Sequence, residues 1–261
     1  MSTTPTAKRD RLELIALYVV SIVAAFVIAA ILVNTSGGSW SKAVEAMING
    51  AFKNPGRWGE TLRRAAPLLI VAAGSAIAAK AGIINIGQEG QVLIGATGAA
   101  FIMTKIHPGS PLMLILGVLL GMLAGAAWAG ISALLYYWRR VPVVLSTLLL
   151  VYLSSQITGY TMTRKFLLLE IVEGSPTRIQ NSAKTAVDSR LGIMHIFGNN
   201  VPLTVPIAII FAVGVAYMLA HSVWGFRLKM LGLNPRTAQR AGVSHVRFGT
   251  MALLTSGAAA G

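Results

Sequence analysis

The feature that most constrains the fold of this chain is a series of apolar runs long enough to cross a lipid bilayer. The first run, Leu12–Val33, has 22 residues with Glu13 as its one charged residue. An α-helix rises about 1.5 Å per residue and the hydrocarbon layer is about 30 Å thick, so such a run can span it. The composition agrees, since 55% of residues are hydrophobic, 11% are charged and the mean hydropathy is +0.69. We therefore expect a membrane protein and not a soluble domain.

The apolar runs predict an all-α polytopic fold with six full transmembrane helices and the start of a seventh. The expected spans are residues 12–33, 65–84, 85–106, 112–138, 142–162 and 201–220, and the seventh begins near Phe248. They form one transmembrane domain over residues 12–261. Because the sequence stops at Gly261 inside an apolar run, we expect the chain to be C-terminally incomplete.

The basic residues predict the orientation of the spans. Cytoplasmic loops of membrane proteins are enriched in Lys and Arg, and the connection 221–247 carries five basic residues and no acid. We therefore place this connection and the tail 1–11 in the cytoplasm, and the connections 34–64 and 163–200 outside. The connection 34–64 fits less well, because its five basic residues outnumber its two acids.

Within the first outer connection, residues 40–52 have the spacing of an amphipathic helix. Such a helix could lie at the membrane interface. An ordinary loop helix packed on its own protein is an equally open interpretation.

Several classes of function are excluded by what the sequence lacks. The net charge of +14 is explained by basic loops and not by nucleic-acid binding. With no cysteine, the chain has no disulfide and no thiolate metal site. It also lacks a Gly-Lys pair, and hence a phosphate-binding loop, as well as zinc-protease and serine-hydrolase motifs. We therefore expect no catalytic residue, no metal and no cofactor in this chain.

The segment 81–91, A-G-I-I-N-I-G-Q-E-G-Q, places polar residues and glycines between two apolar runs. A helix broken at membrane depth is tolerated where its backbone lines a cavity or contacts protein, and transporters use such breaks to bind solutes. An ionisable residue there is a functional candidate by default. The predicted pathway or gate residues are Asn85, Gly87, Gln88, Glu89, Gly90 and Gln91.

A second interpretation of the same segment is a tight turn at the membrane surface. Asn85 and Gln88 have the spacing of a loose capping box, in which the Asn side chain accepts from free N–H groups of the next helix. Glu89 would then complement the dipole of that helix. The residue types favour neither interpretation over the other.

A short cytoplasmic helix is predicted between Asn234 and Gly242. Asn234 is a good N-cap, Pro235 suits the first helical position and Gly242 suits the residue after the end. About two turns are too few to be stable alone, so the helix must dock on something. Its candidate contact residues are the basic pair Arg236 and Arg240 and the small pair Ala238 and Ala241. A loop helix lying against lipid headgroups is the alternative.

A ridge of small residues at intervals of four runs along the fourth span. It contains Gly117, Gly121 and Gly125, followed by Ala129. Small residues at this spacing let helices pack closely in membranes. A path for solute is the less favoured alternative.

Three segments together resemble the permease subunits of bacterial ABC importers, in the ribose and simple-sugar permease family and its purine-nucleoside branch. They are R-A-A-P-L-L from Arg64, the segment 81–91, and G-L-N-P-R-T-A-Q-R-A-G over 232–242. The resemblance extends from about Leu62 to the end of the chain. It identifies residues 234–242 as the counterpart of the coupling helix that contacts the ATPase, and residues 85–91 as the family signature.

The resemblance also implies partners and a location. The expected partners are a cytoplasmic ATPase subunit that uses the ATP, a second homologous permease subunit, and an extracytoplasmic solute-binding lipoprotein, all at the bacterial inner membrane and in contact with its lipids. The expected function is translocation of nucleosides or simple sugars by alternating access. The alternatives are an ion-coupled secondary transporter that uses Glu89, and an ABC permease for branched-chain amino acids.

Overall fold

The structure is a computed structural model that describes residues 5–50, 57–106, 111–169, 182, 184–186, 190–196 and 198–261. Its contacts divide the chain into two units, residues 1–58 and residues 59–261.

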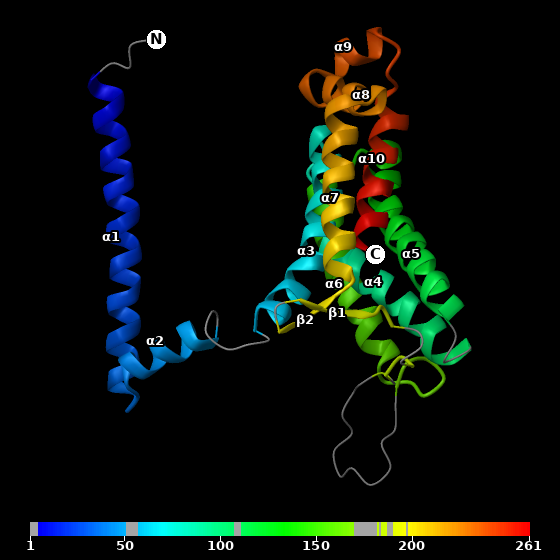
Figure 1. The fold of residues 1–261 in the computed structure, drawn as a ribbon. Helices are drawn as coiled ribbons and strands as arrows, with labels where there is room; N and C mark the ends of the chain where they lie inside the picture. The colour runs from blue at the N-terminus through cyan, green and yellow to red at the C-terminus, as the bar shows by residue number, and fades with distance from the viewer. Residues whose placement is uncertain are drawn as a thin grey trace. The chain divides into compact units, whose positions relative to one another are not determined.

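The first unit contains α1 (Pro5–Thr35) and α2 (Trp40–Ile48) (Figure 1). Residues 13–35 are long and apolar enough to cross a membrane, and no part of that stretch is buried against protein. The ring of Phe26 meets that of Trp40 edge-on at 6.2 Å. The helix predicted over residues 40–52 therefore exists in its first part, while Phe52 lies outside the described residues.

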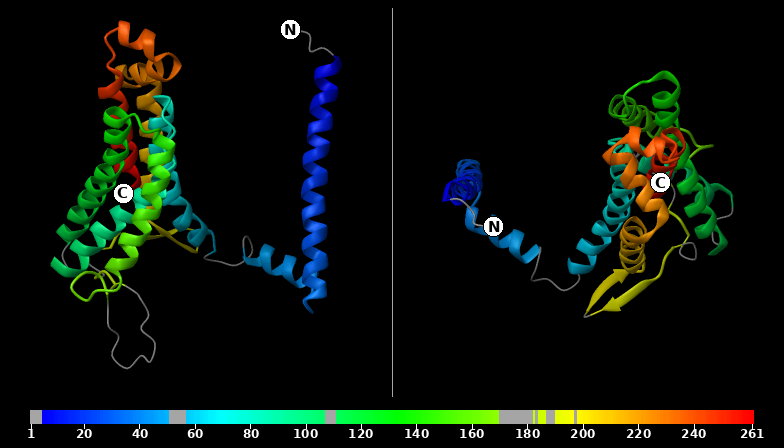
Figure 2. Two further views of the ribbon diagram at one scale, coloured as in Figure 1. Left: turned by 180° about the vertical axis from the view of Figure 1, so that it is seen from behind. Right: turned by 90° about the horizontal axis from the view of Figure 1, so that it is seen from above.

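The second unit is a helical bundle with a small β-hairpin at one end and two short helices at the other (Figures 1 and 2). Its elements are α3 (Arg57–Lys80), α4 (Gln88–Phe101), the π-helical turn η2 (Ile102–Ile106), α5 (Pro111–Arg139), α6 (Val143–Thr161), β1 (Ile193–Ile196), β2 (Asn199–Pro202), α7 (Thr204–His221), α8 (Val223–Leu233), α9 (Pro235–Arg240) and α10 (His245–Ala260).

Two apolar clusters hold the bundle together. The larger lies towards α8 and α9, where the buried Leu228, Leu231, Phe248 and Leu253 meet. The smaller joins the hairpin to α3 and α7 through Ala66, Val201, Val205 and Ala208. At the centre, α5 packs along both α4 and α10.

Five helices are long and apolar enough to span a membrane among the described residues, instead of the six full spans that we predicted. The predicted third span, 85–106, is interrupted at its start. Only the 14 residues of α4 are α-helical, and the five residues of η2 continue them. The polar segment before α4 thus contributes turns and irregular chain, and not helix, to this crossing.

The prediction of a polytopic helical fold is confirmed, and three details of it differ in the structure. Besides the helices, β1 and β2 form a short antiparallel hairpin at the end of the predicted outer connection 163–200. The sixth span begins at Thr204, because Val201 belongs to the hairpin. Finally, α3 begins at Arg57 and not near residue 65.

The early start of α3 has a local electrostatic reason. The Glu60 carboxylate accepts hydrogen bonds from Arg63 at 2.7 and 2.8 Å and from Arg64 at 2.8 Å. Side chains three and four residues apart share a helix face, so these charges support the helix. The charged residues that we assigned to a loop are the first turns of α3.

Candidate functional site

The segment between α3 and α4 is a true break in the helical path. The N–H groups of Ala81, Gly82 and Ile83 close the end of α3 on carbonyls of its last turn. Gly82 has φ +74°, a backbone conformation that L residues rarely adopt. A Cβ atom on Gly82 would lie 3.0 Å from the Cα of Gly232, so the turn rests against the end of α8.

Asn85 and Gln91 pair across this break through two reciprocal hydrogen bonds. Asn85 Nδ2 donates to Gln91 Oε1, and Gln91 Nε2 donates to Asn85 Oδ1. The donor–acceptor distance is 3.2 Å in both hydrogen bonds. Asn85 Oδ1 also accepts from the N–H of Gly87 at 3.1 Å, and Asn85 Nδ2 donates to Ser256 Oγ in α10 at 3.2 Å. The Asn85 side chain therefore joins the break, the first turn of α4 and α10.

Gln88 connects the same cluster to α3. Its Nε2 atom donates to Ser75 Oγ and, at 3.4 Å, to Ser256 Oγ. Gln91 is 1% exposed and Ser256 is fully buried. We call the five residues Ser75, Asn85, Gln88, Gln91 and Ser256 the polar cluster. Buried amides and hydroxyls cost free energy unless they are hydrogen-bonded, and here they satisfy one another.

The capping interpretation is right in part. Asn85 does accept an N–H group, but that group belongs to Gly87, which is itself the N-cap residue of α4 and has no side chain to offer. Glu89 lies in the first turn of α4 with its side chain exposed, outside the polar cluster. Its position therefore suits interaction with the helix dipole.

Gly87 and Gly90 bring α4 against α6. A Cβ atom on Gly87 would lie 2.8 Å from the Cβ atom of Thr147, and one on Gly90 would lie 2.8 Å from Ser154 Oγ. Both distances are too short for a side chain. The two glycines thus allow close backbone approach, which fixes the start of α4 beside α6.

The short helix α9 begins and ends as its sequence predicts. Asn234 Oδ1 accepts from the N–H groups of Arg236 at 3.1 Å and Thr237 at 3.2 Å. After the helix, Gly242 has φ +81°.

The residues of α9 divide into a docked side and a free side. Ala238 is fully buried in the larger apolar cluster, so it anchors α9 on its own chain instead of admitting a partner. Arg236, Arg240 and Ala241 are exposed. Together with the equally exposed Thr237 and Gln239, they form the free surface of α9.

The ridge of small residues on α5 faces other helices of the bundle. A Cβ atom added to Gly117 would lie 2.9 Å from the Met103 side chain. One added to Gly121 would lie 2.6 Å from the Gly261 carbonyl oxygen, and one added to Gly125 would lie 2.4 Å from the Gly257 carbonyl oxygen. The ridge is filled by packing against η2 and α10. It leaves no space for a solute path along these glycines.

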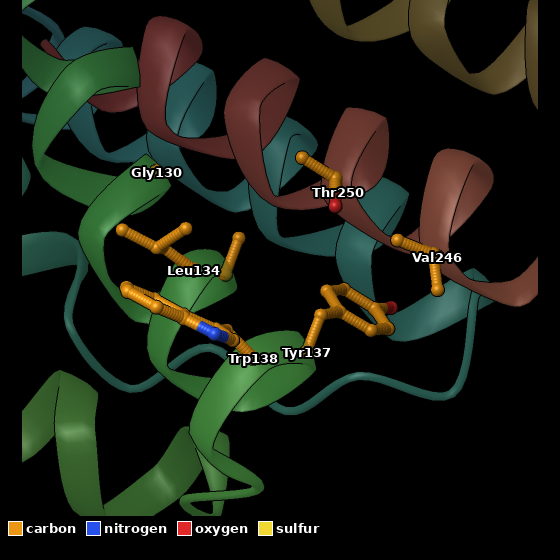
Figure 3. A pocket seen from close by; sticks show the side chains of 7 residues that line it. Gly130, Leu134, Tyr137, Trp138, Val246 and Thr250 are labelled. Carbon is orange, nitrogen blue, oxygen red and sulfur yellow. The ribbon is translucent and has the colours of Figure 1, made fainter.

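A pocket of about 370 Å³ lies between α5 and α10 (Figure 3). Leu134, Tyr137, Trp138 and Val246 give it an apolar lining, and Thr250 adds a hydroxyl group. None of the polar-cluster residues lines it, so we do not assign solute recognition to this pocket. Among the described residues, no group of three or more His, Cys, Asp or Glu could hold a metal ion.

Sequence reasoning missed two members of the polar cluster, Ser75 and Ser256. Both are small hydroxyl residues within otherwise apolar helices. Serine is common at helix contacts in membranes, so the residue type alone carried no specific signal.

Residues 59–261 match the protein family described as the permease component of the branched-chain amino acid transport system. The chain belongs to this family. It is an integral membrane permease subunit of an ABC importer, and the ATPase activity lies in a separate subunit.

Curated relatives extend the similarity beyond the family region. The guanosine ABC transporter permease NupP of Bacillus subtilis is 27% identical over 251 residues, which cover 96% of this permease and 71% of the relative. The nucleoside ABC transporter permease NupB of Lactococcus lactis is 29% identical over 93% of this chain and 67% of its own length. A glucose ABC transporter permease of Haloferax volcanii is 30% identical over 71% of this chain and 50% of its own. No solved structure matches.

The family match over residues 59–261 confirms the expectation that the family resemblance extends from about Leu62 to the end of the chain. The similarity to the guanosine permease covers 96% of this chain, so it also includes much of the first unit.

Proposed function

We propose that this permease translocates nucleosides, or otherwise simple sugars, across the bacterial inner membrane, and that the polar cluster forms part of the path or its gate. The observation that carries the proposal is the hydrogen-bonded set of buried and partly buried amides and hydroxyls at the broken start of α4. The guanosine and nucleoside permeases among its relatives support the choice of solute, and the glucose permease supports the sugar alternative.

The chemistry of the cluster suits an uncharged solute rich in hydrogen-bonding groups. Asn85 and Gln91 each offer a donor and an acceptor, and at present each satisfies the other. A nucleobase edge or a sugar hydroxyl that lies between the two amides can accept a hydrogen bond from one and donate to the other, so neither amide is left unpaired. The exchange keeps the number of hydrogen bonds nearly constant, so the solute is held weakly and can leave.

The cluster also joins the elements that alternating access would move. Ser75 belongs to α3, Gln88 and Gln91 to α4, and Ser256 to α10. Separation of α10 from α3 and α4 breaks the two hydrogen bonds to Ser256, and their re-formation favours the closed arrangement. The cluster therefore biases a two-state equilibrium, which ATP binding elsewhere shifts.

The end of the bundle with α8 and α9 is the cytoplasmic end in this proposal. It carries the basic residues of 221–247, and the exposed Arg236, Arg240 and Ala241 of α9 would contact the ATPase subunit. A second homologous permease and an extracytoplasmic solute-binding lipoprotein would complete the importer, with the N-terminal tail 1–11 in the cytoplasm and the hairpin end outside.

Uptake of labelled guanosine into vesicles that contain the permease and its companion subunits tests the proposal. We expect uptake that requires ATP, that excess unlabelled guanosine suppresses, and that Gln91→Leu reduces. Labelled glucose and leucine are run in parallel, since the sugar and branched-chain alternatives predict uptake of those solutes instead. Uptake that follows a proton gradient and ignores ATP would overturn the proposal.

A further inference from the structure

Basic residues cluster around α8, α9 and the start of α10, and no acidic residue lies among them in the sequence. No Asp or Glu follows Asp188 in the sequence. Five exposed basic residues lie at this end, and the structure gives none of them an ion pair with a described residue: Arg227, Lys229, Arg236, Arg240 and Arg247. Such a surface attracts anions.

Two of these residues, Arg227 and Arg247, line a pocket of about 460 Å³ between α8 and α10. The two helices lie side by side at this end of the bundle (Figures 1 and 2). The loop 241–244 forms one wall of the pocket, and apolar side chains that include Trp224 and Phe248 line the rest. Arg236 and Arg240 of α9 do not line it, whereas Ala241, the residue after α9, does. The pocket therefore adjoins the exposed surface of α9 without including its two arginines.

The pocket combines several groups that favour a negative charge. The Arg227 guanidinium lies 5.6 Å from the centre of the Phe248 ring, close enough for a cation–π contact that orients it. Ser244 caps α10 by accepting the N–H of Arg247 at 3.3 Å. Arg247 therefore lies in the first turn of α10, where the helix dipole adds positive potential.

Exposed apolar side chains adjoin the basic ones. On α8, Val223 is 67% exposed and Phe226 is 61% exposed, on either side of the pocket residue Trp224. On α10, the pocket extends from Arg247 to Met251, one helical turn further along, and Met251 is also exposed. Apolar residues beside Lys and Arg are typical of segments that lie at a membrane surface. An acidic protein loop or a free anion would bind the arginines but would leave the adjoining apolar side chains without a partner.

We propose that this pocket binds the phosphate group of an anionic phospholipid from the cytoplasmic leaflet, with Arg227 and Arg247 as its ligands and the acyl chains along Val223 and Met251. The proposal rests on the proposed function in one respect, since it needs the α8–α9 end to lie at the cytoplasmic surface. The lipid would hold α8 against the start of α10 and so fix the loop that follows α9.

Native mass spectrometry of the purified permease tests the proposal by titration with phosphatidylglycerol and with phosphatidylcholine of the same acyl chains. An arginine beside an anionic lipid surface strengthens binding roughly fivefold. We therefore expect the R227Q/R247Q double variant to have an affinity for phosphatidylglycerol about 30-fold lower than that of the unmodified permease. The affinity for phosphatidylcholine should be the same in the variant and in the unmodified permease. The matched control is Lys229→Gln, an exposed basic residue of α8 outside the pocket, which should leave the preference intact.

Three results would overturn the proposal. An equal loss in K229Q and in the double variant would mean diffuse attraction without a site. Displacement of the lipid by inorganic phosphate alone would indicate a site for free anions. Unchanged lipid binding in the double variant, with loss of the co-purifying ATPase subunit, would make the pocket a protein contact. ATP-dependent uptake is measured on the same preparations, so a failure of the lipid site is distinguished from a failure of the proposed function.

Discussion

Asn85 and Gln91 hold each other through two hydrogen bonds of 3.2 Å, one in each direction, across the break between α3 and α4. The pair fixes a non-helical segment to the first turn of a helix without any charged group. These two hydrogen bonds persist only while the segment and the helix stay together.

Gln91→Leu should destabilise the permease by about 1–3 kcal/mol, because it removes both hydrogen bonds between Gln91 and the partly buried Asn85 amide. The double variant N85L/Q91L should recover part of that loss, since it removes both polar groups. Thermal unfolding in detergent measures both effects. Gln156→Leu is the control, because Gln156 is an exposed glutamine of α6. Equal destabilisation by Gln156→Leu would show that the loss does not arise from the pair.

Gly90→Ala should loosen the contact between α4 and α6. Its Cβ atom would lie 2.8 Å from Ser154 Oγ and 3.1 Å from the Val151 Cα atom, and a backbone atom cannot move aside cheaply. Overpacking of this kind costs about 1–3 kcal/mol. Gly214→Ala in α7 is the matched control, because a Cβ atom there meets nothing within 4 Å. Unfolding midpoints should fall for Gly90→Ala and stay unchanged or rise for Gly214→Ala.

Local signals in the sequence were enough to predict some elements of the fold. The Asn-Pro start and the Gly end of α9 are each encoded by residues next to the helix, and the structure has the helix between them. The break at 81–87 was visible as polar residues and glycines between two apolar runs. In both cases the cause and the effect lie within a few residues of each other.

Other features depend on contacts that the sequence order hides. Asn85 and Ser256 are 171 positions apart, so their hydrogen bond could not be predicted from either residue's neighbours in the sequence. The hairpin of β1 and β2 is short and turns at Gly198 with φ +73°, and we overlooked that glycine inside a polar connection. The start of α3 was missed because Glu60, Arg63 and Arg64 suggest a loop until their pairing on one helix face is known.

Asn234→Ala should uncouple ATP use from transport. Its side chain satisfies two N–H groups at the start of α9, and loss of such an N-cap costs about 1 kcal/mol. A helix of six residues is too short to stay folded after that loss of stability, so Arg236 and Arg240 lose their fixed positions on its surface. We expect the variant to be expressed at the normal level. In reconstituted vesicles it should take up less guanosine for each ATP molecule that is hydrolysed.

The conservative variant Asn234→Asp keeps an oxygen acceptor and should restore coupling. Gln239→Ala, an exposed change in the same helix, serves as the control for general effects of altering α9. If Asn234→Asp fails as badly as Asn234→Ala, the cap is not the reason for the loss.

Tyr137→Phe should stabilise the permease. The Tyr137 hydroxyl is buried and has no hydrogen-bond partner among the described residues. It lies beside Gly249 of α10, next to the pocket shown in Figure 3. Removal of a buried, unpaired hydroxyl group should gain about 1 kcal/mol in the free energy of unfolding. Tyr136→Phe, the neighbouring and less buried change, should have little effect. A loss of stability in Tyr137→Phe would mean that the hydroxyl has a partner in the assembled transporter.

The orientation of the bundle can be tested by single cysteines, because the natural sequence contains none. Lys165 follows α6 in the predicted outer connection, and Gln239 lies on α9; both side chains are exposed. A membrane-impermeant maleimide applied to intact spheroplasts should label Lys165→Cys, whereas Gln239→Cys should react only after lysis. Leu123→Cys, which is in the α5 span, should stay unlabelled in both, since a thiol in hydrocarbon does not ionise. Labelling of Gln239→Cys from outside would place α9 on the face away from ATP, where neither contact with the ATPase nor binding of a cytoplasmic-leaflet lipid could occur.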